Sequence, residues 1–189
     1  MIAELRLADA AILYGGTLLN PDCRFSSVSI DSRKTAEGDL FVALRGDRFD
    51  AHQFLPDVAE KAVGLVVSQA DKKITLPQWV VEDTTQALGQ IAEMRRDQHS
   101  GPVIAITGSS GKTSVKEMTT SILRQNSAVQ ATSGNLNNHI GVPLTLIAMG
   151  ADTDIVVLEM GASAGGEIAY LCGIAKPTIA LVNNAQHAH

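Results

Sequence analysis

The sequence contains few of the features that mark secreted, membrane or metal-cluster proteins. Its two cysteines, Cys23 and Cys172, stand far apart and lack the spacing of a metal site. No apolar run approaches the roughly 20 residues that cross a bilayer. At the N-terminus, charged and apolar residues alternate where a signal peptide would be continuously apolar. We therefore expect a reduced, cytoplasmic protein without a membrane span.

Basic residues are also in the minority. The chain has 15 Lys and Arg against 20 Asp and Glu, which gives a formal net charge of −5. Nucleic-acid partners need a basic surface, so this balance argues against them and favours a small-molecule ligand. No repeat or low-complexity tract occurs, and a hydrophobic content of 45% over 189 residues is enough for one large domain or two small ones.

The most informative segment is Thr107–Ser114, TGSSGKTS, which follows the apolar run Val103–Ile106 and opens a helical pattern. This order is typical of a phosphate-binding loop. Glycines let the backbone approach phosphate oxygens, and the following helix N-terminus supplies partial positive charge. Lys112 adds a full charge and Thr113 offers a hydroxyl to Mg²⁺. A nucleoside triphosphate is therefore the first ligand to propose.

One position departs from the standard pattern, because Ile106 stands where the longer motif has its first glycine. The match is thus to a compact G-x-x-G-K-T form. The alternative is an ordinary Gly/Ser turn between a strand and a helix with an exposed lysine. The order of strand, turn, Lys-Thr pair and amphipathic helix favours the phosphate-binding interpretation.

The first part of the chain predicts a small α/β domain, which we place at residues 1–82. A helix over 84–98 follows, and its apolar face can pack on either neighbouring domain, so this boundary rests on composition. The apolar patterns of the small domain predict strands at 28–30, 40–44, 64–68 and 79–82 and a helix at 54–62.

Residues 83–189 predict a doubly wound parallel sheet of the kind found in P-loop ATPases. Strands and helices alternate, and the strands are continuous apolar runs because helices cover both faces of such sheets. The predicted strands are 103–106, 128–132, 154–159 and 178–182, with helices at 114–125, 142–148 and 166–172.

In such sheets ligands bind beyond the carboxyl ends of the strands. Glu159 closes the apolar strand over 154–159, so we expect its carboxylate near the phosphates as a Mg²⁺ ligand. The alternative is a solvated glutamate at a strand end. Asn135, Asn137 and Asn138 lie in a loop that predicts either hydrogen bonds to a ligand or only a turn. His187 and His189 are candidates for a second metal, or for plain exposure.

These motifs together resemble the Mur ligases of bacterial peptidoglycan synthesis. The matching segments are TGSSGKTSVKEM, GNLNNHIGVP, EMGA with GEI, and the end LVNNAQHAH. The N-terminal stretch VSIDSRKTAEGDLFVALRGDRFDAHQF is similar to the UDP-sugar-binding domain of members that act on longer peptide precursors. The best fit is to members that add D-alanyl-D-alanine to UDP-N-acetylmuramoyl-tripeptide, and it covers essentially the whole chain.

The resemblance implies an ATP-dependent amide ligase. ATP would phosphorylate the terminal carboxylate of the tripeptide, and the amine of D-alanyl-D-alanine would displace phosphate from the acyl phosphate. A positive residue and Mg²⁺ are needed because two anions must be brought together. The alternatives are a UDP-sugar-binding module without catalysis and another P-loop enzyme such as a small-molecule kinase.

The resemblance also assigns residues, each by its position in this sequence. Lys112, Glu159 and His189 would be catalytic, and Thr113, Glu159 and His189 would serve the metal. ATP would be bound by Gly108, Ser109, Ser110, Gly111, Lys112, Thr113, Ser114, Asn137 and Asn138. The UDP-linked substrate would be bound by Asp31, Ser32, Arg33, Arg48, Asp50, His52 and Asn135.

Family members continue beyond the segment that this sequence matches. The resemblance therefore implies a first domain, part of the central ATPase domain and no C-terminal domain, and we expect the piece by itself not to complete ligation. The full-length protein is expected to be a monomer. For this piece self-association is a hypothesis, because its last strand would expose an apolar edge.

Overall fold

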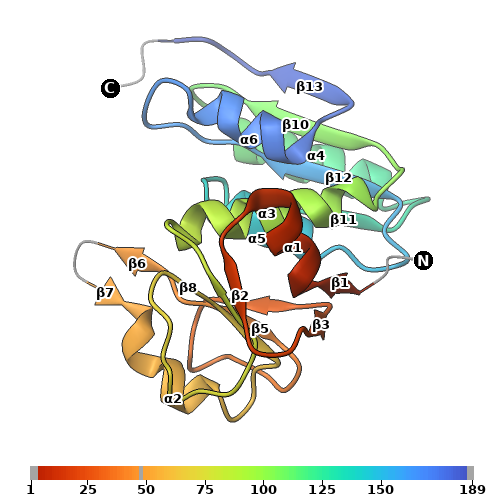
Figure 1. Ribbon diagram of the computed structural model, residues 1–189. Coiled ribbons are helices and arrows are strands. Elements are labelled where there is room, and N and C mark those ends of the chain that lie inside the picture. The colour runs from red at the N-terminus through yellow and green to blue at the C-terminus, as the bar shows by residue number, and fades with distance from the viewer. Residues whose placement is uncertain (1–3, 47–48, 187–189) are drawn as a thin grey trace. The chain divides into compact units, whose positions relative to one another are not determined.

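The computed structural model describes residues 4–46 and 49–186, which form two compact units that divide between Met94 and Arg95 (Figure 1). Both units are mixed α/β structures built around a sheet, as the sequence predicts. No helix in the described ranges is long and apolar enough to cross a membrane.

The first unit has a five-stranded sheet in the order β2-β9-β8-β5-β4, in which only the β2–β9 pair is antiparallel. The predicted strands near residues 28, 40, 64 and 79 are all present. The helices are α1 (Leu7–Tyr14), η1 (Ala51–Phe54), α2 (Leu55–Val58) and α3 (Thr84–Asp97). The strands are β1 (Leu5–Arg6), β2 (Thr17–Leu19), β3 (Arg24–Phe25), β4 (Val28–Ser29), β5 (Leu40–Val42), β6 (Arg45–Gly46), β7 (Phe49–Asp50), β8 (Gly64–Val67) and β9 (Gln78–Val80).

Two features of this unit differ from the sequence prediction. The elements before residue 26 were not predicted, because β1 and β3 have two residues each and α1 leaves Ile12 and Leu13 exposed, which blurs its apolar face. The helix predicted at 54–62 begins earlier, as the 3-10 turn η1, and α2 ends at Val58. Pro56 stands in the first turn of α2, where a missing N–H costs no hydrogen bond.

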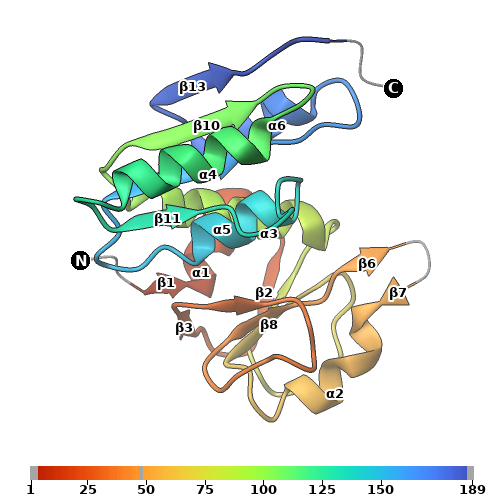
Figure 2. The same ribbon diagram turned by 180° about the vertical axis from the view of Figure 1, so that it is seen from behind.

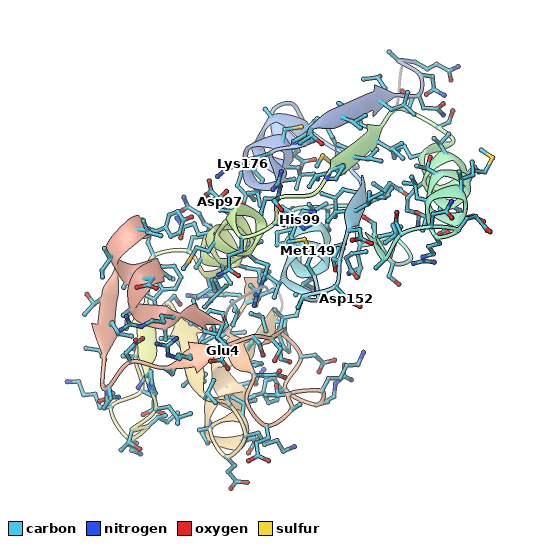
Figure 3. All side chains as sticks on the ribbon, turned by 90° about the vertical axis from the view of Figure 1, so that its right-hand side faces the viewer. Glu4, Asp97, His99, Met149, Asp152 and Lys176 are labelled. Atoms are coloured by element: carbon cyan, nitrogen blue, oxygen red, sulfur yellow. The ribbon has the colours of Figure 1, made fainter. Side chains whose placement is uncertain are left out.

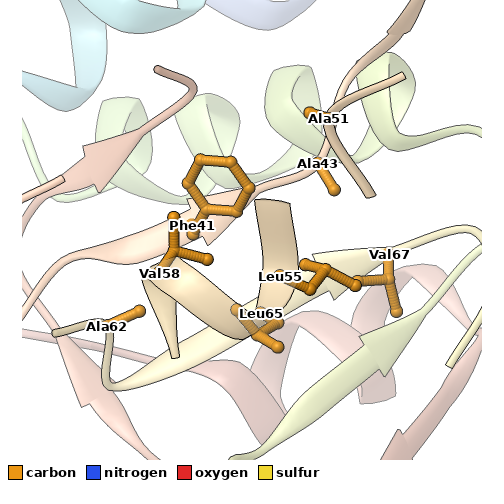
Figure 4. Close-up of a cluster of buried hydrophobic side chains, with 8 residues drawn as sticks. All are labelled: Phe41, Ala43, Ala51, Leu55, Val58, Ala62, Leu65 and Val67. Atoms are coloured by element: carbon orange, nitrogen blue, oxygen red, sulfur yellow. The ribbon is translucent and has the colours of Figure 1, made fainter. Parts of the chain in front are cut away.

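One hydrophobic core cluster of the first unit lies between the sheet and α2. Inward side chains of β5 and β8 pack against one side of η1 and α2, and every member is at most 6% exposed. Figure 4 shows these residues, which are Phe41, Ala43, Ala51, Leu55, Val58, Ala62, Leu65 and Val67. The strand β8 is buried on both faces, which is why it is a continuous apolar run.

The second unit is the predicted doubly wound sheet, with four parallel strands in the order β11-β12-β10-β13. Its strands are β10 (Val103–Thr107), β11 (Val129–Ala131), β12 (Ile155–Glu159) and β13 (Ile179–Val182). Its helices are α4 (Lys112–Leu123), α5 (Gly141–Ile147) and α6 (Glu167–Ala175). The chain crosses the sheet in opposite directions through α4 and through α6. Right-handed crossovers then place these helices on opposite faces, as Figures 1 and 2 show.

The last residues of α3 belong to the second unit by their contacts. The guanidinium of the buried Arg96 donates to the carbonyls of Ala175 and Lys176 at 2.7 and 2.9 Å and to that of His99 at 2.7 Å. Lys176 pairs with Asp97 at 2.7 Å, and Figure 3 labels both residues. The Arg96 guanidinium thus lies at the C-terminal end of α6, where the helix dipole favours a positive charge. The structural division therefore falls after Met94, within α3, whereas composition placed the boundary before this helix.

Candidate active site

The loop between β10 and α4 has the backbone of a phosphate-binding loop. Gly108 and Gly111 have φ angles of +142° and +75°, values that L side chains rarely adopt. A Cβ at Gly111 would lie 2.7 Å from Asn183 Nδ2. Both glycines are therefore required by conformation, and at Gly108 a Cβ would also lie only 3.0 and 3.1 Å from the backbone N and O of Asn184.

Lys112 is the first residue of α4, and its side chain turns back over this loop. Its Nζ donates to the carbonyl of Gly108 at 2.7 Å. The ammonium group is half-buried and lies beside the N-terminus of a twelve-residue helix, whose first N–H groups have no partner inside the helix. Thr113 and Ser114 are exposed in the same first turn. Positive charge and free donors thus gather at one end of α4, as an anion requires.

Glu159 lies close to the loop because of the sheet register. It stands opposite Ile106 in the β10–β12 pair, and the next residue, Met160, donates its N–H to the Ile106 carbonyl at 2.9 Å. The Glu159 side chain is 2% exposed. Its Oε1 accepts from Asn137 Nδ2 at 2.8 Å, while its Oε2 is buried without a hydrogen-bond partner. An orphaned buried carboxylate oxygen is costly and is the kind of group that a cation satisfies.

A chain of hydrogen bonds through Thr132 and Lys116 holds the backbone of Glu159 in place. Its N–H donates to Thr132 Oγ1 at 3.0 Å, and the carbonyl of Thr132 accepts from Lys116 Nζ at 2.9 Å. Lys116 is 1% exposed and also pairs with the exposed Glu117 at 2.6 Å. Lys116 and Thr132 were not predicted as site residues. The buried lysine lies four residues after Lys112 and therefore on the same face of α4. This spacing is the signal in the sequence that could have pointed to Lys116.

The three asparagines of the loop before α5 have different surroundings. Asn137 reaches Glu159, and its carbonyl accepts from Gly161 N at 2.8 Å. Asn138 Oδ1 accepts from the N–H groups of Ile140 and Gly141, so this side chain caps the start of α5. Asn135 is exposed. Of the three, Asn137 is the one that the structure brings to the carboxylate.

The segment after β13 lies against the phosphate-binding loop. Asn184 bonds to both Ser109 and Ser110, and the Asn183 side chain donates to the Ser110 carbonyl at 2.8 Å. Both asparagines belong to the motif LVNNAQHAH, but neither was predicted to have a role. His187 and His189 lie outside the described residues.

No group of three or more His, Cys, Asp or Glu side chains that could hold a metal is found in ranges 4–46 and 49–186. A resident all-protein metal cage is therefore not formed by those residues. Glu159 and Thr113 offer one carboxylate and one hydroxyl at the same edge of the sheet. This small oxygen set suits Mg²⁺, which usually takes one or two carboxylates and completes its shell with phosphate oxygens and water.

A cavity of about 460 Å³ in the first unit contains three of the predicted substrate residues. It lies beyond the carboxyl end of β4 and is lined by Ile30, Asp31, Ser32, Arg33, Phe49, Ala51 and Phe54. The rings of Phe49 and Phe54 stack with centroids 5.8 Å apart. The two rings were missed, although both occur in the quoted stretch DRFDAHQF.

Asp31 and Arg33 form a bidentate pair at the mouth of this cavity. Arg33 Nε and Nη2 lie 2.9 and 2.8 Å from the two carboxylate oxygens of Asp31. The hydrogen bond from Arg33 lowers the pKa of Asp31 to about 2, and the same bond raises the pKa of Arg33. The Asp31 carbonyl accepts from the N–H groups of Lys34 and Thr35, which closes a tight turn. The cavity thus combines aromatic faces with a fixed guanidinium.

Asp50 and His52 are held by each other. His52 Nδ1 lies 2.6 Å from Asp50 Oδ1, and His52 Nε2 accepts from the Ser68 N–H at 2.9 Å. Hydrogen bonds from His52, that of its backbone N–H foremost, lower the pKa of Asp50. Ser68 Oγ is also 3.2 Å from Nε2, which resembles a nucleophile triad. The single lone pair of Nε2 already accepts a backbone N–H, so His52 is not placed to activate that hydroxyl.

Ser68 lines a second cavity, of about 650 Å³, at the start of α3. Asp83 caps this helix by accepting from the N–H groups of Thr85 and Gln86 at 2.7 and 3.1 Å. Asp50 and His52 therefore support the wall of this cavity through Ser68. Arg48 lies outside the described residues, and its predicted role stays a prediction, as do those of Asp50 and His52.

Comparison with known proteins identifies the family. Residues 24–96 match the domain described as "Mur ligase family, catalytic domain", and residues 106–189 match the "Mur ligase middle domain". The chain belongs to the Mur ligase family. The resemblance of its motifs is thereby confirmed, and the first matched segment ends at residue 96, beside the division in α3.

Two curated relatives of this chain have the same name. The chain is 46% identical over 186 residues to the UDP-N-acetylmuramoyl-tripeptide--D-alanyl-D-alanine ligase of Buchnera aphidicola subsp. Acyrthosiphon pisum. It is 44% identical over 186 residues to the protein of the same name from Escherichia coli K12. Each alignment covers 98% of this chain and 41% of the relative. The chain thus spans about two fifths of the length of these Mur ligases.

Solved structures give the same result. MurF from Acinetobacter baumannii superposes with a TM-score of 0.89 at 37% identity, covering 100% of this chain and 42% of that one. The MurF ligase from Thermotoga maritima in complex with ADP superposes with a TM-score of 0.73 at 36% identity, covering 80% of this chain and 35% of that one. The fold of this Mur ligase chain is therefore that of MurF over the matched region.

Proposed function

We propose that this chain provides the UDP-substrate and ATP sites of a ligase that adds D-alanyl-D-alanine to UDP-N-acetylmuramoyl-tripeptide. The observation that carries the proposal is the buried Glu159, whose orphaned Oε2 lies at the strand end beside the phosphate-binding loop. The names of its relatives support the choice of substrates. Membership of the Mur ligases favours a ligase over a small-molecule kinase. We place the reaction in the cytoplasm and expect the full-length protein to be a monomer.

ATP is assigned to the loop from Gly108 to Ser114. Its triphosphate carries several negative charges, and the tripeptide carboxylate that it must phosphorylate carries another. Lys112 would exchange the Gly108 carbonyl for a phosphate oxygen and neutralise part of this charge. The exposed first turn of α4 would supply N–H donors to the same phosphates. The loop therefore holds the anions together, which is the main electrostatic difficulty of the reaction.

Mg²⁺ fits the residues present, since a carboxylate oxygen without a partner is available at Glu159 and a hydroxyl at Thr113. When bound, the ion would neutralise phosphate charge and polarise the transferred phosphoryl group. Asn137 would orient the carboxylate by its bond to Oε1. Thr132 would hold the backbone of Glu159 in place by accepting a hydrogen bond from its N–H. A further contribution by His189 is part of the proposal.

The UDP-linked substrate is assigned to the cavity that Asp31, Ser32 and Arg33 line. The stacked Phe49 and Phe54 offer apolar surface for a planar base, and aromatic contacts of this kind tolerate an offset geometry. Arg33 offers N–H groups to a diphosphate, since its guanidinium is largely exposed at the rim. Asn135 is assigned to the substrate by motif alone.

Calorimetry of the 189-residue chain tests both assignments. We expect separate one-site binding of Mg·ADP and of UDP-N-acetylmuramoyl-tripeptide, with the first dependent on Mg²⁺. Binding of the UDP compound without any binding of Mg·ADP would reduce the chain to a UDP-sugar-binding module. Binding of neither would contradict the proposal. Ligation itself is to be assayed on the protein of the length that its relatives have.

A further inference from the structure

The chain after β13 is attached to the phosphate-binding loop by hydrogen bonds from three residues. The Asn184 carbonyl accepts from the Ser109 N–H at 3.1 Å, and Asn184 Oδ1 accepts from the Ser110 N–H at 3.0 Å. Ser109 Oγ donates to the carbonyl of Gln186 at 2.9 Å and accepts from its N–H at 2.9 Å. The loop is therefore held from outside by a segment more than 70 residues later in the chain.

The Asn184 side chain forms hydrogen bonds with both the N–H and the carbonyl of Ser110. While Oδ1 accepts from its N–H, Nδ2 donates to its carbonyl at 3.1 Å and to its Oγ at 3.0 Å. An amide side chain can do this because it carries one acceptor oxygen and two N–H donors in a single planar group. The Asn183 side chain adds a second donor to the Ser110 carbonyl at 2.8 Å. The absent Cβ atoms of Gly108 and Gly111 leave the space in which both asparagines sit.

This arrangement restricts which donors a phosphate can use. Each backbone N–H donates one good hydrogen bond, and those of Ser109 and Ser110 are directed at Asn184. Phosphate binding then falls to the N–H groups from Gly111 into the first turn of α4, together with the Lys112 ammonium. The Ser110 peptide is also fixed before any ligand arrives, which lowers the ordering cost of binding.

We infer that Asn184 is a positioning residue that holds the phosphate-binding loop in its binding conformation and so sets the affinity for the nucleotide phosphates. The inference rests on the proposed function for its second half only. Asn184 acts through Ser109 and Ser110, so it needs no contact with the nucleotide. It also ties the loop to the stretch of sequence that leads to His189.

Amide hydrogen exchange by NMR on the 189-residue chain tests the first half. In Asn184→Ala, we expect exchange of the Ser109 and Ser110 amides to accelerate at least about tenfold, because the acceptor of the Ser110 N–H is lost and the segment that holds Ser109 is released. Amides of β10 and α4 are expected to stay unchanged. Asn126→Ala, at an exposed asparagine between α4 and β11, is the matched control and should change neither. Retained protection of both serine amides in Asn184→Ala would overturn the inference.

Calorimetry with Mg·ADP tests the second half. Asn184→Ala should weaken binding about tenfold, and Asn184→Asp should weaken it further. A carboxylate cannot donate to the Ser110 carbonyl and adds negative charge near the phosphates. Affinity for UDP-N-acetylmuramoyl-tripeptide should not change, which a general loss of folding would not permit. Unaltered Mg·ADP affinity despite lost protection would overturn this half. Failure of the unsubstituted chain to bind Mg·ADP would instead count against the proposed function, while the exchange rates would still decide the role of Asn184 in the loop.

Discussion

At the scale of single residues, the site depends on one carboxylate that is expensive to bury. Glu159 has one oxygen bonded to Asn137 and the other unpaired, at 2% exposure. Such a group lowers stability unless a ligand satisfies it. Residues that lower the stability of the unliganded protein are often kept because they bind a ligand, and Glu159 fits this description.

Glu159→Gln should therefore separate binding from stability. The glutamine keeps the shape but brings no charge to a cation, so we expect the Mg²⁺-dependent part of ADP affinity to fall at least about tenfold. The free energy of unfolding should stay equal or rise by up to about 1 kcal/mol, because an unpaired buried charge is removed. Calorimetry with and without Mg²⁺ measures the change in ADP affinity, and urea unfolding measures the change in the free energy of unfolding. Unchanged Mg²⁺ dependence would show that another group holds the ion.

Asp31 and Arg33 give a prediction on pH. The pair lowers the pKa of Asp31 from 3.8 to about 2, so the folded chain binds this proton less readily than the unfolded chain does. The stabilisation is therefore fully present above the unfolded pKa and is lost as the pH falls through the folded pKa. In Arg33→Gln, the pKa of Asp31, followed by carbonyl-carbon NMR, should return toward 3.8. An Asp31 pKa that stays near 2 in this variant would mean that the backbone N–H of residue 33, which donates to Asp31 Oδ1 at 3.1 Å, and not the guanidinium, causes the shift.

At the scale of elements, α4 performs two tasks with two lysines one turn apart. Lys112 faces the phosphate-binding loop, and Lys116 is buried against the end of β11. Positions four residues apart lie on the same helix face, so the sequence predicts that both point the same way but not that the second is buried. The difference arises from the tertiary structure, since the carbonyl of Thr132 is brought to Lys116 by the sheet.

Lys116→Met should destabilise the second unit by about 1–2 kcal/mol, because the buried carbonyl of Thr132 loses its donor while the side-chain volume is kept. Glu117→Gln is the matched control, since it weakens only the exposed side of the same pair and should cost clearly less than Lys116→Met does. Urea unfolding followed by far-UV circular dichroism compares the two. Equal stability of Lys116→Met and the unsubstituted chain would mean that removal of the buried charge offsets the lost bond.

The strand β13 is the last strand of its sheet within the described residues, and its side chains are exposed. Ile179, Leu181 and Val182 are 53%, 43% and 63% exposed. An open apolar edge pairs readily with another chain. We expect concentration-dependent self-association of the 189-residue chain by light scattering, and its reduction in Ile179→Lys. A monomer at every concentration would contradict this prediction.

At the scale of the whole molecule, the long apolar strands and the glycine loop could be predicted from the sequence, because their signals are local. The order of β10, α4, β11, α5, β12, α6 and β13 follows from periodicity, and Glu159 from its place at a strand end. What could not be predicted depends on distant partners. Asn184 meets Ser110 across 74 residues, and α3 is divided between two units by Arg96, whose partners lie 79 and 80 residues away.

The two sites lie in different units, which predicts that their ligands stabilise different parts of the chain. Trp79, the one tryptophan of the sequence, is buried in the first unit and donates its Nε1–H to the Gly15 carbonyl. Its fluorescence therefore follows unfolding of that unit. A ligand present at about 100 times its Kd adds about 2.7 kcal/mol to the unit that binds it. UDP-N-acetylmuramoyl-tripeptide should raise the midpoint of the Trp79 transition.

Mg·ADP should instead raise the midpoint of the transition that Trp79 does not report, followed by far-UV circular dichroism. Glu159→Gln is the control, since it should abolish the Mg²⁺-dependent part of the second shift and leave the first unchanged. A shift of the Trp79 transition by Mg·ADP as large as that by the UDP compound would contradict the prediction. The two units would then unfold in one cooperative transition, and α3 is a helix that carries residues of both.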